Sequence, residues 1–134
     1  MIYLDSSAIV KLVRPEAESP VLVEWLNAAA HPAVTSTLAE VEVPRALRRV
    51  APERLGGVAA VLARLARMEI DAPVRATAAA YVDAGLRSLD AIHLATAEML
   101  VAAGKDVTAF VSYDVRQSAA AAAAGFPPHA PGRE

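Results

Sequence analysis

The hydrophobic pattern of the chain alternates between short apolar runs and longer stretches with apolar positions at helical spacing. The short runs predict strands at residues 2–4, 33–36, 68–70 and 107–114. The longer stretches predict helices at residues 8–13, 21–30, 37–49, 51–66, 73–84, 88–103 and 115–124. Strands that alternate with helices predict a three-layer α/β/α sandwich around a central, mainly parallel sheet. We expect residues 1–134 to form a single domain, in which residues 127–131 are extended because of their prolines.

Two of the predicted strands end in a carboxylate. Ile2, Tyr3 and Leu4 are continuously apolar, as in a central parallel strand covered on both faces, and Asp5 follows them. The run that begins at Val107 ends in the same way, at Asp114. Ligands of open α/β sheets bind at the carboxyl ends of the strands. Aspartate and serine are also favoured helix caps, however, and taken alone Asp5 is better explained as a cap.

Other acids fall on helices that leave the same edge of the predicted sheet. Glu40 and Glu42 are two positions apart, roughly 200° around a helix, so only one of them can face a site shared with Asp5. Asp90 lies in the first turn of its helix, where the helix dipole favours an acid whatever its function. Right-handed crossovers would bring Asp5, Glu42, Asp90 and Asp114 to one rim. Carboxylates so close together repel one another, so the cluster indicates a cation, and oxygen ligands suit Mg²⁺ or Mn²⁺.

Composition narrows the classes of function. The chain has 134 residues and no cysteine, which excludes disulfides and thiolate metal sites. With 13 basic and 15 acidic residues the formal net charge is −2, so any nucleic-acid binding must use a local patch. Asp5 interrupts the first apolar run too early for a secretory signal, and no stretch is long enough to cross a membrane, so we expect a cytoplasmic protein. His93 stands alone beside an apolar helix face and is better explained as a satisfied helix residue than as a metal ligand.

Four segments together resemble the PIN-domain endoribonucleases, specifically the VapC toxins of VapBC toxin–antitoxin pairs. They are Met1-Ile2-Tyr3-Leu4-Asp5-Ser6-Ser7-Ala8, Ser36 with Val41-Glu42-Val43-x-Arg45-Ala46-Leu47, Leu89-Asp90-Ala91-Ile92-His93-Leu94-Ala95, and Ser112-Tyr113-Asp114 with the alanine-rich stretch up to Gly125-Phe126. The resemblance implies that Asp5, Glu42, Asp90 and Asp114 bind Mg²⁺ or Mn²⁺, with the hydroxyls of Ser6 and Ser112 beside them. It also implies cleavage of RNA, a tRNA or an rRNA, to 5′-phosphate and 3′-hydroxyl ends, a homodimer, and a VapB antitoxin that blocks the site with a basic side chain.

The chain departs from the family pattern around Glu42. Glu40 is a rival ligand, and Glu42 is preferred because its distance from Ser36 fits the family. Pro44 removes one helix hydrogen bond nearby and should bend the helix. On the same helix the arginines are open to more than one interpretation: they contact RNA, or they form a solvated face or a dimer contact. These arginines are Arg45, Arg48 and Arg49.

Alternatives from other classes make different demands on the sequence. A phosphatase on a similar α/β fold would need a second aspartate two residues after Asp5, where Ser7 stands. A receiver domain would need paired acids at the first strand end and a late lysine. A catalytically silent PIN-like binding scaffold would be expected to lack one of the four acids, and a metal-independent ribonuclease would rely on paired histidines. The sequence carries no recognisable code for the RNA that is cut, the number of metal ions or the antitoxin.

Overall fold

A computed structural model describes all residues, 1–134, and has a five-stranded sheet at its centre. All neighbouring strands are parallel, in the order β3-β2-β1-β4-β5. The strands are β1 (Ile2–Leu4), β2 (Ala33–Ser36), β3 (Ala66–Met68), β4 (Ala109–Val111) and β5 (Pro128–His129). The prediction of a mainly parallel sheet is confirmed.

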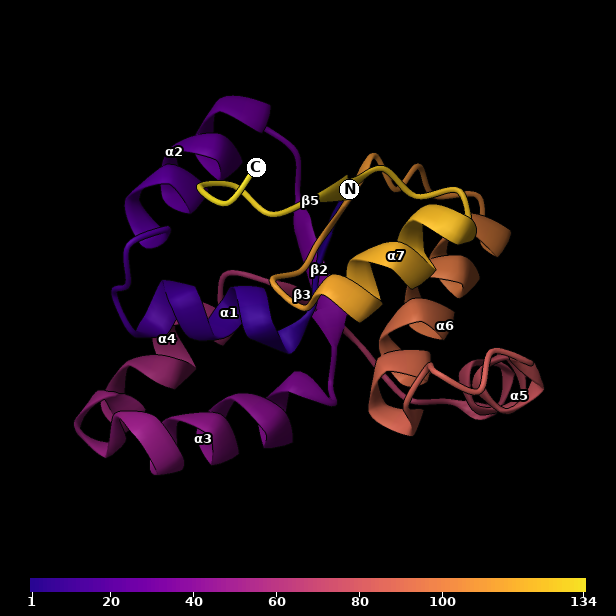
Figure 1. The fold of residues 1–134 in the computed structure, drawn as a ribbon, viewed down its shortest axis with the longest axis horizontal. Coiled ribbons are helices and arrows are strands. Elements are labelled where there is room, and N and C mark those ends of the chain that lie inside the picture. The colour runs from indigo at the N-terminus through magenta and orange to yellow at the C-terminus, as the bar shows by residue number, and fades with distance from the viewer.

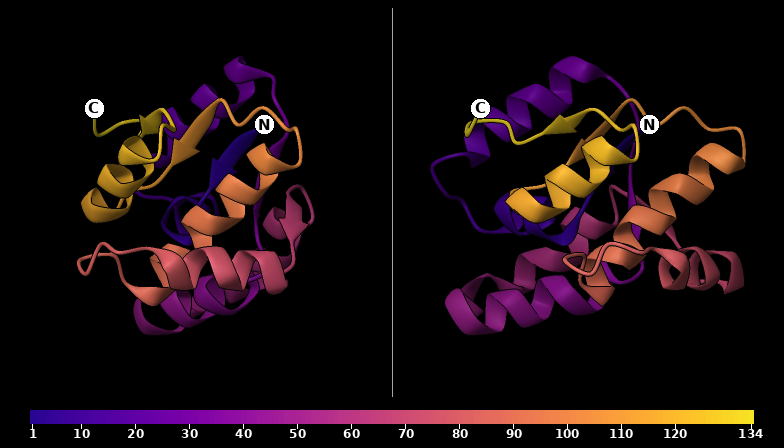
Figure 2. Two further views of the ribbon diagram at one scale, coloured as in Figure 1. Left: turned by 90° about the vertical axis from the view of Figure 1, so that its right-hand side faces the viewer. Right: turned by 45° about the vertical axis from the view of Figure 1, so that its right-hand side comes forward.

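Helices cover both faces of this sheet, which confirms the predicted three layers (Figure 1). One face is covered by α1 (Ser6–Val13), α2 (Ser19–Ala29), α3 (Ala39–Val50) and α4 (Val58–Leu62). The other carries α6 (Ser88–Ala102) and α7 (Val115–Ala123). Outside that layer, α5 (Ala72–Ala80) lies against α6, as Figure 2 shows. No helix combines the length and the apolar character needed to cross a bilayer.

The central strand β1 contributes to the core on both faces. Ile2 and Leu4 pack in the cluster formed with α1 to α4, whereas Tyr3 points to the opposite face. There the Tyr3 ring stacks on Phe110 of β4 with ring centroids 4.9 Å apart. This two-sided burial explains why the strand is continuously apolar, because a central parallel strand has no solvent-facing side.

The middle of the chain differs from its predicted elements. The expected helix at 51–66 is a 3₁₀ helix (Pro52–Gly57) followed by the short α4, because Gly56 and Gly57 weaken a regular helix. The third strand then begins at Ala66 instead of residue 68, and the helix expected to reach residue 84 ends at Ala80. The extended segment around Pro128 joins the sheet as its edge strand, where a proline is tolerated because one side makes no ladder bonds.

Candidate active site at the carboxyl edge of the sheet

Asp5 occupies the junction between β1 and α1 and caps the helix. Its Oδ1 accepts hydrogen bonds from the backbone N–H of Ala8 at 3.1 Å and from the hydroxyl of Ser7 at 2.6 Å. The residue is only 4% exposed. Burial raises the pKa of Asp5 above its ordinary value, and the nearby imidazole of His93 and the hydroxyls of Ser112 and Ser7 offset only part of this effect. A charge in this position is therefore costly until a cation accompanies it.

Glu42 lies in the first turn of α3 and turns toward the start of α1. Its Oε1 accepts a hydrogen bond from the Ser6 hydroxyl at 2.7 Å and lies 2.8 Å from Nε2 of His93. Burial opposes ionisation of Glu42, but the hydrogen bonds from His93 and Ser6 outweigh it and lower the pKa. Glu40 points elsewhere, since its carboxylate pairs with Arg67 of β3 at 3.1 Å on the surface. Of the two glutamates, the structure places only Glu42 beside the other candidate residues.

The carboxylates of Asp90 and Asp114 both pair with the guanidinium of Arg87. Asp114 caps α7, and its Oδ1 accepts from the backbone N–H groups of Arg116 and Gln117 at 2.9 and 3.3 Å. The guanidinium of Arg87 lies 3.5 Å from Oδ2 of Asp90 and 3.3 Å from Oδ2 of Asp114. Burial, followed by the negative charge of Asp114, raises the pKa of Asp90, while Arg87 acts in the opposite direction. Two acids that repel each other are thus bridged by a positive group.

The predicted acids lie along one edge of the sheet, but they do not converge. Glu42 and Asp90 line one small pocket of about 300 Å³ together with Arg87. No three acidic or histidine side chains are close enough to hold one metal ion, which departs from the tight cluster expected from the sequence. The reason is local, because each acid already has a helix N–H, a hydroxyl, an imidazole or Arg87 as its partner.

The donor set nevertheless fits a hard divalent cation. It consists of carboxylate and hydroxyl oxygens, which are the preferred ligands of Mg²⁺ and Mn²⁺. Arg87 shows where positive charge is favoured, since its guanidinium already lies between Asp90 and Asp114. Asp5, Glu42, Asp90 and Asp114 are the residues that would hold such an ion.

Serine hydroxyls tie the loop after β4 to the start of α1. The expected neighbour Ser112 is fully buried, and its Oγ accepts from the backbone N–H of Asp114 at 3.0 Å. Ser7, which the sequence did not single out, accepts from the backbone N–H of Tyr113 at 2.9 Å while it donates to Asp5. The sequence did contain a signal for Ser7, because it is the second of the two serines that follow Asp5 at the end of β1. Through Ser7 the two capping aspartates are held at a fixed separation.

Tyr113 of the same loop is held by the C-terminal segment. Its hydroxyl donates to the carbonyl of Pro131 at 2.7 Å, and the side-chain cations of Lys11 and Arg133 lie over its ring, 4.8 and 5.3 Å from the centroid. Lys11 is buried and pairs with Glu16 at 2.8 Å. Lys11 is therefore not on a solvated helix face.

His93 belongs to the site, a role that the sequence pattern did not indicate. Its side chain is buried and contacts Glu42, Ser6 and Tyr3 through its two ring nitrogens. The prediction that the hydrogen bonds of His93 are satisfied is correct, because both ring nitrogens have a partner. The missed signal was spacing, because His93 follows Asp90 by three positions and so lies near it on one face of α6.

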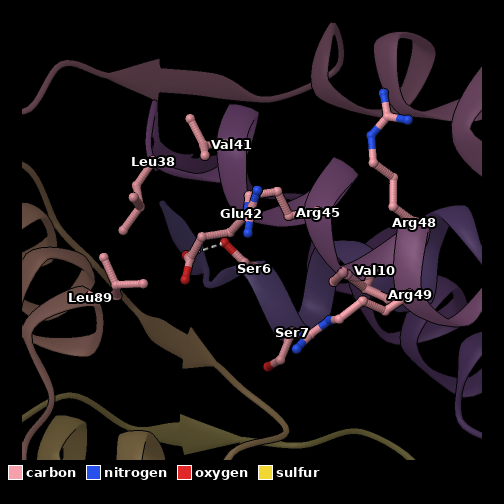
Figure 3. Close-up of a pocket in the computed structure, with 11 residues that line it drawn as sticks. Ser6, Ser7, Val10, Leu38, Val41, Glu42, Arg45, Arg48, Arg49 and Leu89 are labelled. Carbon is pink, nitrogen blue, oxygen red and sulfur yellow. Dashed lines mark hydrogen bonds between the residues drawn. The ribbon is translucent and has the colours of Figure 1, made fainter.

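A groove of about 510 Å³ runs beside Glu42 (Figure 3). It is formed by the start of α1 and by α3, with Leu89 from α6. The arginines of α3 contribute to its lining, are exposed, and pair with no acid, and Arg48 points away from Glu42 in this view. They are Arg45, Arg48 and Arg49. The groove therefore offers unpaired positive charge next to the acidic edge.

Comparison with known proteins agrees with this architecture. Residues 2–123 match the family model described as PIN domain. The chain is 52% identical over 134 residues to Ribonuclease VapC35 of Mycobacterium tuberculosis, covering 99% of this chain and 98% of that protein. It is 42% identical over 130 residues to Ribonuclease VapC46 of the same species, covering 97% of each.

Solved structures show the same fold at low sequence identity. A crystal structure of VapC20 from Mycobacterium tuberculosis, described as a Sarcin-Ricin loop cleaving toxin, matches with a TM-score of 0.71 at 16% identity over 94% of this chain and 96% of that one. A toxin–antitoxin complex from Klebsiella pneumoniae matches with a TM-score of 0.71 at 17% identity over 98% of both chains. The chain belongs to the PIN-domain family and, within it, to the VapC type.

Proposed function

We propose that this VapC-type nuclease is a metal-dependent endoribonuclease that hydrolyses phosphodiester bonds in a structured RNA, with Asp5, Glu42, Asp90 and Asp114 as ligands of Mg²⁺ or Mn²⁺. PIN-domain ribonucleases generally use a divalent metal. The observation that carries the assignment to these residues is the Arg87 guanidinium, which sits between Asp90 and Asp114 where a cation is needed. The other two acids come from β1 and α3 at the same edge of the sheet.

The side chains have distinct tasks in this proposal. When bound, a divalent ion makes its water a nucleophile near neutral pH and neutralises charge on phosphoryl oxygens. Glu42 is kept ionised by its hydrogen bonds and is ready to bind a cation. Asp5 uses Oδ1 for the helix cap, which leaves Oδ2 for the ion. Asp90 and Asp114 would exchange Arg87 for the metal, and Arg87 would then be free to contact the RNA phosphate.

The groove beside Glu42 supports an approach path for the RNA backbone. Phosphate contacts from arginine supply most of the sequence-independent affinity for nucleic acids. Arg45, Arg48 and Arg49 are unpaired and exposed on α3, so their charge is available although the net charge of the chain is −2. The substrate class is a tRNA or an rRNA, and the description of VapC20 as a Sarcin-Ricin loop cleaving toxin favours testing ribosomal RNA first.

We extend the proposal to the partners of the protein. A VapB-type antitoxin would neutralise the nuclease by placing a basic side chain against Asp90 and Asp114, the position that Arg87 now occupies. Val41 and Leu89 are 57% and 48% exposed beside the groove and would give such a partner apolar anchors. The toxin–antitoxin complex among the structural neighbours supports a partner of this kind, and a homodimer is part of the same proposal.

The proposal is tested by incubating purified protein with ribosomal RNA and bulk tRNA in Mg²⁺, in Mn²⁺ and in EDTA. We expect cleavage only with a divalent ion, 5′-phosphate ends at the cut, and loss of cleavage in Asp90→Asn. Ligation of adaptors that require a 5′-phosphate, followed by sequencing, identifies the target. Undiminished cleavage in EDTA would refute the metal-dependent mechanism. Binding of RNA without cleavage in either metal would favour the alternative of a catalytically silent scaffold.

A further inference from the structure

A chain of hydrogen bonds connects the core of the protein to Glu42. The hydroxyl of Tyr3 lies 2.7 Å from Nδ1 of His93. On the other side of the ring, Nε2 lies 2.8 Å from Oε1 of Glu42 and 3.1 Å from the hydroxyl of Ser6. The Ser6 hydroxyl itself donates to Oε1 of Glu42 at 2.7 Å. Tyr3 is completely buried and His93 is 2% exposed, so water does not compete for the bond between them, whereas the bonds to Glu42 are partly buried.

When the imidazole of His93 is neutral, donors and acceptors can be assigned to this series of hydrogen bonds in only one way. The carboxylate of Glu42 can only accept, so Nε2 of His93 must carry the hydrogen that lies between them. Nδ1 is then a bare acceptor, and the Tyr3 hydroxyl must donate to it. The carboxylate of Glu42 therefore determines which ring nitrogen carries the hydrogen, and the Tyr3 hydroxyl completes the chain as the donor to the other nitrogen.

Tyr3 and Glu42, at the two ends of this series of hydrogen bonds, differ in rigidity. Tyr3 is part of the central strand, stacks on Phe110, and meets the His93 ring edge-on at 76° with centroids 5.8 Å apart. Glu42 has a long side chain, and Pro44 in the same helix provides no backbone N–H for the carbonyl of residue 40. The Tyr3 end of the hydrogen-bond chain is therefore the rigid one, and Glu42 is the side chain that needs to be held in place.

We propose that Tyr3 and His93 are positioning residues for the metal site: Tyr3 holds the ring of His93 in place by donating to Nδ1, which leaves the hydrogen on Nε2, and His93 together with Ser6 fixes the carboxylate of Glu42. The role assigned to Glu42 rests on the proposed function, whereas the tautomer does not. Partners that orient a metal-binding side chain typically change metal affinity or activity by roughly 10- to 100-fold when they are removed.

The tautomer is tested directly by long-range ¹H–¹⁵N NMR spectra of the histidine rings. The wild type should show His93 with a protonated Nε2 and a bare Nδ1, and His93→Gln identifies its signals among the three histidines. Tyr3→Phe should shift the signal of Nδ1, because this nitrogen loses its hydrogen-bond donor. A wild-type ring with hydrogen on Nδ1, or spectra of Tyr3→Phe identical to those of the wild type, would overturn the proposal.

The effect on the site is tested by titrating Mg²⁺ and Mn²⁺ against cleavage rate. His93→Ala removes the donor, whereas His93→Gln retains an amide N–H in a similar place. The half-saturating metal concentration should rise roughly 10- to 100-fold in His93→Ala, less in Tyr3→Phe, and His93→Gln should restore part of the loss. Tyr81→Phe is the matched control, because its hydroxyl also bonds to a residue of α6, Glu98 at 2.8 Å. It should behave as the wild type.

The outcomes separate this proposal from the proposed function. A wild type that does not respond to metals refutes the nuclease mechanism, yet leaves the NMR test of the tautomer in force. A metal-dependent wild type with an unchanged metal requirement in His93→Ala refutes the positioning role alone. The positioning role is also refuted if His93→Gln is as impaired as His93→Ala, or if Tyr81→Phe is as impaired as Tyr3→Phe. If His93→Ala fails to fold, Tyr3→Phe and His93→Gln still decide the question.

Discussion

Substitution of Asp5 by asparagine separates the charge of this residue from its role as a helix cap. Asparagine keeps Oδ1 as acceptor for the backbone N–H of Ala8 and for the Ser7 hydroxyl, and it is as good an N-cap as aspartate. It removes only the negative charge from a residue that is 4% exposed. We therefore expect Asp5→Asn to abolish nuclease activity and yet leave the metal-free fold as stable as the wild type, or more stable.

The magnitude follows from the direction of the pKa shift. Burial raises the pKa of Asp5 above its ordinary value of 3.8, so the folded protein binds this proton more tightly than the unfolded chain. The associated stability is present in full below pH 3.8 and is lost as the pH rises through the raised folded value. At neutral pH each unit of upward shift destabilises the wild type by about 1.4 kcal/mol, which the asparagine variant regains.

A divalent ion should make the wild type more stable than Asp5→Asn. Binding to the folded state alone stabilises by about 2.7 kcal/mol when the free metal is a hundredfold above its Kd. The gain belongs to the wild type, because Asp5→Asn lacks one ligand. Metal should therefore stabilise the wild type strongly and the variant much less.

Thermal unfolding of both proteins in EDTA, Mg²⁺ and Mn²⁺, at pH 5 and pH 7, measures all of these effects. Asp90→Asn is a second variant of the same design, since burial and Asp114 raise the pKa of Asp90 as well. The reasoning is refuted if Asp5→Asn melts several degrees below the wild type in EDTA and neither protein responds to the metals. The acids would then be structural caps.

Three further predictions test other parts of the structure. Glu42→Gln should reduce the cleavage rate roughly 100-fold or more, because displacing a reacting group by about 1 Å from its productive position can have an effect of that size. Glu40→Gln should change the rate little, and the opposite ranking of the two variants would reassign the ligand to Glu40. Arg87→Ala removes the cation that competes for Asp90 and Asp114, so calorimetric titration should show tighter Mg²⁺ binding, while stability changes by about 0.5 kcal/mol or less because the side chain is 65% exposed. Phe110→Ala should lower the free energy of unfolding by about 3–5 kcal/mol in urea denaturation, and a loss below 1 kcal/mol would mean that the ring stacked on Tyr3 is not part of a tight core.

The fold was predictable where the local pattern has one physical meaning. The run Ile2–Leu4 is apolar on consecutive positions, which only a strand covered on both faces accommodates, and the structure places it at the centre of the sheet. The segment 51–66 was not predictable, because alanine and leucine spacing there suits a helix while Gly56 and Gly57 weaken it, and tertiary packing decides between them. Strand β3 shifted by two residues as a consequence.

The positions of the candidate acids could be predicted from the sequence, but their pairings could not. Acids after predicted strands and in first helical turns were visible from position alone, as for Asp5 and Asp90. The partners of these acids come from remote segments: His93 contacts Glu42 across 51 positions and Tyr3 across 90. Such contacts depend on how α3, α6 and β1 pack together, and no local periodicity encodes that.

The competing interpretations of the aspartates, helix cap and metal ligand, are compatible in this structure. Asp5 and Asp114 each commit Oδ1 to backbone N–H groups at the start of a helix. In Asp114 the second oxygen, Oδ2, faces Arg87 instead. The cap fixes the rotation of the carboxylate and so aims the other oxygen away from the helix, toward the shared edge of the sheet. Folding therefore orients these two carboxylates through their helix caps, whereas Glu42 caps nothing and depends on Ser6 and His93 for its orientation.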